Sequence, residues 1–131
     1  KTYKPGKKRI LVVEDTEINL EIITEVLKDA GYLVDSAVNG SIALEKVKDS
    51  KPGYYDLILM DIQMPVMDGY HATKAIRRLK NPALSSIPIV ALSANAFDED
   101  KRRSKESGMN AHMEKPIDTP QLMEVISDMM G

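Results

Sequence analysis

The sequence contains no cysteine, no long apolar run and almost no excess of charge of either sign. Without cysteine, the chain can form neither disulfide bonds nor thiolate metal sites, which suits a reducing compartment. The net charge of −2 provides no basic surface for nucleic acid or an anionic membrane. No apolar stretch approaches the roughly 20 residues of a membrane span, and we expect no signal peptide. We therefore expect a cytoplasmic protein.

Length and composition predict one globular domain. The chain has 131 residues, of which 43% are apolar and 29% charged, enough to bury a single core. Residues 1–8 are basic, with Pro5 and Gly6 among them, and we interpret them as a linker. We expect residues 9–131 to be the folded domain, cut from a longer protein.

Short apolar runs alternate with helical patterns along the chain, which predicts an α/β fold. We expect strands at 9–13, 33–37, 57–61, 87–93 and 110–114, and helices at 17–30, 40–49, 70–79, 98–107 and 119–130. Thr16 and Thr119 are the expected helix caps, and Gly31 is expected to end the first helix. Five such units predict a (βα)5 three-layer sandwich around a parallel sheet, in the flavodoxin-like order 2-1-3-4-5.

Polar residues suited to phosphate or metal chemistry follow the predicted strands. Glu14 and Asp15 follow the first strand, Asp61 ends the third, Ser93 ends the fourth, and Lys115 follows the fifth. The carboxyl ends of parallel strands meet at one edge of a sheet, so we expect these side chains to cluster. Ligands that are all oxygen suit Mg²⁺. The pattern therefore predicts phosphate chemistry with a divalent cation, Mg²⁺ or Mn²⁺.

The predicted helix 98–107 has no large apolar residue. A helix usually docks through an apolar stripe, so this one could be anchored only by Phe97 before it and Met109 after it. We expect it to be the most mobile helix.

The motifs together resemble the response-regulator receiver domains of two-component signalling, over residues 8–130. The matching residues are Glu14-Asp15, Asp61 within Asp-Ile-Gln-Met-Pro-Val-Met-Asp-Gly, Ser93 followed by Ala94, and Lys115-Pro116. The residues that flank these motifs are more similar to those of receivers in hybrid sensor histidine kinases than to those of receivers in transcription factors. The resemblance implies a domain without its own kinase, in the cytoplasmic part of a kinase that could be membrane-anchored.

The resemblance also implies roles for the site residues. Asp61 would accept the phosphoryl group, and the domain would catalyse its own phosphorylation and dephosphorylation. Asp15 and Asp61 would bind the metal directly, with the backbone carbonyl of Gln63, and Glu14 would act through water. Lys115 would stabilise charge on the phosphoryl oxygens.

Further residues would control and transmit the signal. Gln63 and Asn95 would tune hydrolysis of the acyl phosphate. Ser93 would move toward the phosphoryl group and His112 would turn inward, as an aromatic residue does in this family. The Lys115-Pro116 bond is expected to be cis from the family pattern.

The first helix has an apolar arc that is wider than docking requires. Ile18 or Leu20 should therefore remain partly exposed, and in receivers a helical phosphodonor docks there. The expected partner is a histidine kinase or a histidine phosphotransfer domain, without nucleic acid or membrane contact, and the domain would be a monomer or a weak dimer.

Three other functions remain open at this point. One is a degenerate receiver used only for binding, which the presence of all five site residues disfavours. A phosphohydrolase with an Asp nucleophile would need a carboxylate two residues after Asp61, where Gln63 stands. A flavodoxin-like FMN-binding protein would need phosphate donors in the first loop, where Glu14 and Asp15 would repel phosphate.

Overall fold

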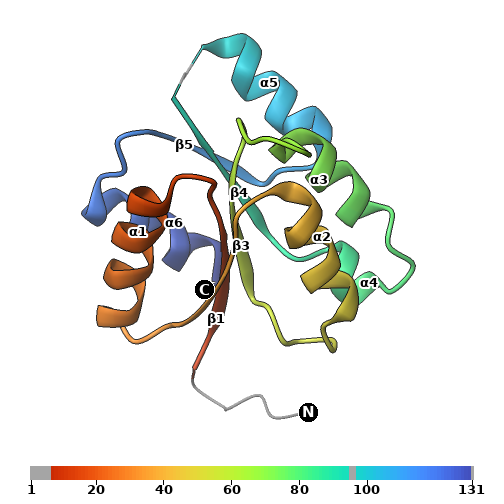
Figure 1. The fold of residues 1–131 in the computed structure, drawn as a ribbon, viewed down its shortest axis with the longest axis horizontal. Helices are drawn as coiled ribbons and strands as arrows, with labels where there is room; N and C mark the ends of the chain where they lie inside the picture. Colours follow the sequence, from red (N-terminus) through yellow and green to blue (C-terminus); the bar gives the residue numbers. More distant parts are fainter. Residues whose placement is uncertain (1–6, 95–96, 131) are drawn as a thin grey trace.

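Five parallel strands form one sheet in the order β2-β1-β3-β4-β5, in a computed structural model that describes residues 7–94 and 97–130 (Figure 1). The strands are β1 (Arg9–Val13), β2 (Leu33–Ala37), β3 (Leu57–Asp61), β4 (Ile89–Ser93) and β5 (Ala111–Glu114). This is the predicted strand order. The last two strands begin one or two residues later than predicted.

Helices cover both faces of the sheet. They are α1 (Glu17–Asp29), α2 (Gly40–Asp49), α3 (Gly69–Arg77), α4 (Pro82–Ser85), α5 (Asp98–Ser107) and α6 (Thr119–Met130). In Figure 1, α1 and α6 lie on one side of the strands, and α2, α3 and α5 lie on the other. Among the described residues, none of these helices has the length and apolarity needed to cross a bilayer.

The alternation of side chains along the strands builds a separate core on each face. One core joins β1 and β3 to α1 and α6, through Ile10, Val12, Leu57, Leu59, Ile23, Leu27, Leu122 and Ile126. The other joins the same strands to α2 and α3, through Leu11, Val13, Ile58, Met60, Ala43, Val47, Ala72 and Ile76. Every residue of β3 and of β4 is buried, as expected for parallel strands covered on both sides. The predicted three-layer sandwich is confirmed.

Helix caps account for most differences from the predicted elements. The short helix α4 was missed: the Asn81 side chain accepts a hydrogen bond from the Ala83 backbone N–H, and Pro82 fills the first turn, as helix starts favour. Thr119 is not the cap of α6. It lies inside the helix, and Asp118 accepts from the Gln121 N–H at 3.0 Å instead.

The first helix begins at Glu17 as predicted and ends close to the predicted position, but its N-cap lacks the expected side-chain hydrogen bond. Gly31 follows the helix with a φ of 99°, a left-handed conformation that glycine adopts without a steric penalty. Thr16 occupies the N-cap position of α1, but its side chain makes no capping hydrogen bond.

Helix α5 is docked differently from the prediction. Phe97 is 69% exposed, so it is not an anchor, whereas Met109 is buried and packs into the core beside α3. The side chains that α5 itself buries are Ser104 and Ser107. Its mobility stays a prediction.

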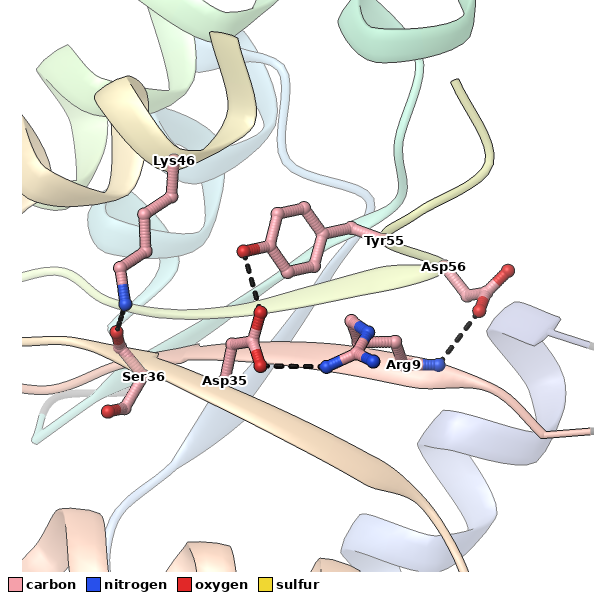
Figure 2. Close-up of polar contacts among 6 residues, drawn as sticks. All are labelled: Arg9, Asp35, Ser36, Lys46, Tyr55 and Asp56. Atoms are coloured by element: carbon pink, nitrogen blue, oxygen red, sulfur yellow. Dashed lines mark hydrogen bonds and ion pairs between the residues drawn. The ribbon is translucent and has the colours of Figure 1, made fainter. Parts of the chain in front are cut away.

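The outer edge of the sheet, at β2, has a network of polar contacts (Figure 2). The Asp35 carboxylate accepts a hydrogen bond from Arg9 Nη1 at 2.8 Å and from the Tyr55 hydroxyl at 2.9 Å. The Lys46 ammonium, from α2, donates to the Ser36 carbonyl. These contacts tie the edge strand to its neighbour and to the segment that precedes β3.

Candidate functional site

The ends of four strands are held in alignment by backbone hydrogen bonds that continue past the ladders. The Glu14 N–H donates to the Ala37 carbonyl at 3.0 Å, and the Lys115 N–H donates to the Ser93 carbonyl at 2.7 Å. Asp61 pairs with Leu92 on β4. The polar residues that follow the strands are therefore fixed at one edge of the sheet.

Three carboxylates converge at this edge. One oxygen each of Glu14, Asp15 and Asp61 lies within 4.8 Å of the others. Glu14 and Asp61 are buried, and Asp15 is exposed. The structure thus brings together the three acidic residues that the sequence placed in one cluster.

Lys115 links two of the carboxylates. Its Nζ lies 2.9 Å from Glu14 Oε1 and 3.2 Å from Asp61 Oδ1. The other oxygen of Glu14 accepts a hydrogen bond from the Thr16 N–H at 3.1 Å. This bond was not predicted from the sequence, where Glu14 lies two positions before the N-cap residue of α1.

The electrostatics of the cluster favour a bound cation or proton. Burial, and then the negative charge of Glu14, raise the pKa of Asp61 to about 6, although Lys115 opposes the shift. For Lys115, burial lowers the pKa, but its contacts with Glu14 and Asp61 outweigh burial and raise it. Lys115 therefore stays charged, while two neighbouring carboxylates compete for its single charge.

The donor set fits a hard divalent cation. Both oxygens of Glu14 already accept hydrogen bonds, from Lys115 and from Thr16, which leaves Asp15 and Asp61 as the two carboxylates best able to bind a metal. One or two carboxylates, with water and phosphate oxygens, are the usual ligands of Mg²⁺. The residues present fit the predicted ion.

The loop after Asp61 packs tightly against the site. A Cβ at Gly69 would lie 2.4 Å from the Asp61 carbonyl oxygen, so only glycine allows α3 to begin there. The Gly69 N–H donates to the Ile62 carbonyl at 2.8 Å. Between them, Gln63 is exposed and lines a cavity of about 340 Å³ that Ser93 also borders.

The two predicted switch residues lie on neighbouring strands. Ser93 is buried at the end of β4, and its pairing partner on β5 is Glu114, while His112 pairs with Ala91. Nδ1 of His112 lies 3.3 Å from the Ser104 hydroxyl of α5. Asn95, the other predicted tuning residue, lies outside the described residues.

The predicted docking surface on α1 is partly apolar and exposed. Ile18 is 70% exposed, but Leu20 is half-buried and packs against the core. Ile22 was missed: it is exposed and lines a cavity of about 410 Å³ with Glu14, Lys115 and Pro116. Its position four residues after Ile18, on the same helix face, was the available signal. The Lys115-Pro116 bond is cis, as predicted.

Comparison with known proteins identifies one family. The family model described as "Response regulator receiver domain" matches residues 10–127. "Hybrid signal transduction histidine kinase B" of Dictyostelium discoideum is 46% identical over an alignment of 124 residues, and the match covers 88% of this chain and 6% of that protein. The chain thus spans only a small part of this relative. The match gives no support to the phosphohydrolase or FMN-binding alternatives.

A short response regulator and a solved receiver domain match over nearly their whole length. The "Polar-differentiation response regulator DivK" of Brucella anthropi is 34% identical over 95% of this chain and 97% of its own. The solved receiver domain of sensor histidine kinase PA1611 from Pseudomonas aeruginosa, described with a magnesium ion in its active site cleft, is 35% identical. It superposes with a TM-score of 0.86 over 96% of this chain and 99% of that one.

Proposed function

This chain belongs to the response regulator receiver domains of two-component systems, and from that premise we propose that Asp61 is its phospho-acceptor. The observation that supports the assignment most directly is that Asp61 lies 3.2 Å from the Lys115 ammonium and in one cluster with the Glu14 and Asp15 carboxylates. Asp61 contacts both the Lys115 ammonium and the Asp15 carboxyl.

The transfer reaction would be a nucleophilic displacement at phosphorus. A carboxylate oxygen of Asp61 attacks the phosphorus of a phosphohistidine, forming an O–P bond and an acyl phosphate. The N–P bond breaks, and its electron pair leaves with the imidazole nitrogen of the donor. The Lys115 ammonium moves from the Asp61 carboxylate to the phosphoryl oxygens, where it stabilises the charge that they carry in the transition state.

Asp15 and Asp61 would hold Mg²⁺ or Mn²⁺, with the Gln63 backbone carbonyl as a third ligand and Glu14 acting through water. The ion would neutralise charge on the phosphoryl oxygens. Glu14 supports this arrangement because it keeps Lys115 beside the acceptor. The magnesium ion described for the PA1611 receiver is consistent with this proposal.

The phosphodonor would be a histidine kinase or a histidine phosphotransfer domain. Ile22 on α1 lines the crevice that Glu14 and Lys115 border, and the exposed Ile18 lies one turn before it on the same helix face. An apolar helix face would dock there and present its phosphohistidine to Asp61. Leu20 would support this surface from below. The kinase relatives favour a place within a larger phosphorelay protein.

Phosphorylation would be transmitted through Ser93 and His112. The Ser93 hydroxyl would donate to a phosphoryl oxygen, and its movement would make room for His112 on the next strand. Gln63 and Asn95 would influence how quickly water reaches the acyl phosphate.

The test is phosphorylation with acetyl phosphate, a small-molecule donor. We expect the wild-type chain with Mg²⁺ to gain one acid-stable, base-labile phosphoryl group, seen by mass spectrometry and phosphate-affinity electrophoresis. Asp61→Asn should abolish the modification, and chelation of the metal should slow it. Asp68→Asn is a matched control, since Asp68 caps α3 in the same loop. A wild-type level of phosphorylation in Asp61→Asn would contradict the proposal.

A further inference from the structure

Helix α5 contacts the rest of the domain mainly through polar side chains. It has no large apolar residue between Asp98 and Ser107, and it buries Ser104 and Ser107, which are 2% and 4% exposed. By contrast, α1 buries Ile23 and Leu27. Apolar burial is the main source of the free energy that docks a helix. A single polar contact therefore contributes a larger share of this free energy in α5 than in α1.

One of these contacts joins α5 to strand β5. The Ser104 hydroxyl lies 3.3 Å from Nδ1 of His112. The hydroxyl of Ser107 has a different partner, because it donates to the Ser104 carbonyl within the same helix at 2.7 Å. The two serines are equally buried, yet only the contact of Ser104 crosses from the helix to the strand.

His112 occupies a position from which a change in its ring reaches α5. It lies on β5, where it pairs with Ala91, two residues before Ser93 on β4. The ring is half-buried. His112 and Ser104 also line a cavity of about 460 Å³ between α5 and β5, together with Lys101 and Lys105. The buried Ser104 hydroxyl and the half-buried His112 ring therefore meet at the wall of this cavity.

We propose that Ser104 is a positioning residue for His112: its hydroxyl holds the imidazole against α5 before phosphorylation, and the inward turn of the ring breaks this bond and loosens α5. The proposal rests on the proposed function, which supplies the phosphorylation of Asp61 and the movement of Ser93. Since α5 has no internal apolar anchor, loss of the bond weakens its docking more than the same loss would weaken α1. Phosphorylation is then transmitted as a change in the order of α5 and of the adjoining cavity.

The test uses the imidazole ¹⁵N chemical shifts of the 131-residue chain together with amide hydrogen exchange. The chain has two histidines, so His71 on α3 serves as an internal reference. We compare Ser104→Ala with Ser107→Ala, first without ligand and then with Mg²⁺ and beryllofluoride, a stable mimic of the phosphoryl group.

Ser104→Ala is expected to shift His112 Nδ1 and to speed amide exchange in α5 by roughly three- to tenfold, the effect of one net hydrogen bond. Ser107→Ala should leave His112 Nδ1 unchanged. Beryllofluoride should move the wild-type signals toward those of Ser104→Ala. Equal His112 shifts and equal α5 exchange in the two alanine variants would overturn the proposal, as would activation that leaves the His112–Ser104 contact intact.

A second set of variants, made in a protein that carries His112→Phe, separates loss of the Ser104–His112 contact from a general loss of stability. His112→Phe keeps a ring on β5 but removes Nδ1, so adding Ser104→Ala to it should not speed α5 exchange further. A further increase as large as in the wild type would contradict the inference. Failure of beryllofluoride to bind Asp61 would instead refute the proposed function, while the comparison of unliganded variants would still test the role of Ser104.

Discussion

The Lys115 ammonium lies 2.9 Å from an oxygen of Glu14 that has no exposure to solvent. A charge this deeply buried is stable only when it is paired and hydrogen-bonded. Lys115 therefore has a structural role as well as its proposed role in transfer, and the two roles can be separated by mutation.

Replacing Lys115 with methionine should destabilise the domain because it leaves the Glu14 charge buried and unpaired. We expect the free energy of unfolding to fall by about 2–3 kcal/mol, less than for a fully buried pair because the Lys115 side chain is 22% exposed. Urea denaturation checks this. Adding Glu14→Gln to Lys115→Met should restore most of the lost free energy of unfolding. If the effects of the two substitutions on this free energy were simply additive, the coupling between Glu14 and Lys115 would be contradicted.

Replacing Asp61 with asparagine should stabilise the metal-free domain at neutral pH. The pKa of Asp61 is raised from 3.8 to about 6, so between these values the folded state binds a proton that the unfolded state has lost. Wild-type stability therefore falls as the pH rises through this window. In EDTA above pH 6, Asp61→Asn should be more stable by about 1–2 kcal/mol, allowing for screening.

The same comparison, made by thermal or urea unfolding at several pH values, gives its own control. The difference between wild type and Asp61→Asn should shrink toward about pH 4 and should also shrink when Mg²⁺ is added. A difference that does not depend on pH would show that the raised pKa of Asp61, caused by burial and by the Glu14 charge, is not its source.

Arg77 should be a main contributor to stability, although it lies far from the phospho-acceptor. Its guanidinium donates to the carbonyls of Gly108, Ser85 and Ile87 and to the Asn110 side chain. Arg77→Met should lower the free energy of unfolding by about 2–4 kcal/mol. The neighbouring Arg78 is exposed, so Arg78→Met is the matched control and should stay within about 0.5 kcal/mol of wild type. Equal losses would refute the role of Arg77.

Ile18→Ala should weaken phosphotransfer from a phosphohistidine donor without loss of stability. The side chain is 70% exposed, so its removal costs little in folding, but a contact at the centre of an interface is worth about 1–2 kcal/mol, or roughly five- to thirtyfold in KM. Ile42→Ala, on α2, is the control. Acetyl phosphate should phosphorylate both variants at the wild-type rate, because it needs no docking surface. An unchanged KM in Ile18→Ala would contradict the proposal that the phosphodonor docks on α1.

Local sequence patterns predicted most of the strands and strand-end residues that position the site. Apolar runs that end at Asp61 and Ser93 define both the sheet and the residues at its edge, because strand order and strand ends follow from the sequence. The features that were missed depend on contacts between distant residues. Arg77 bonds residues 8 to 33 positions away, and no local pattern indicates that Phe97 is exposed while α5 buries Ser104 and Ser107.

The Asn81-Pro82 start of α4 is a different kind of omission. Both residues are standard signals of a helix start, but the helix has only four residues, too few to show an apolar period. The Thr119-Pro120 pair gave the opposite error, because Asp118 was the better acceptor for the open N–H groups of α6.

The position of Lys46 limits how copies of this domain can assemble. Residues 33 and 37 of β2 make their backbone hydrogen bonds toward β1, so the Ser36 carbonyl, an odd number of positions away, faces outward, and Lys46 covers it (Figure 2). A lysine across an open strand discourages pairing with a foreign strand. Two copies of this domain are thus kept from joining their sheets through the β2 edge.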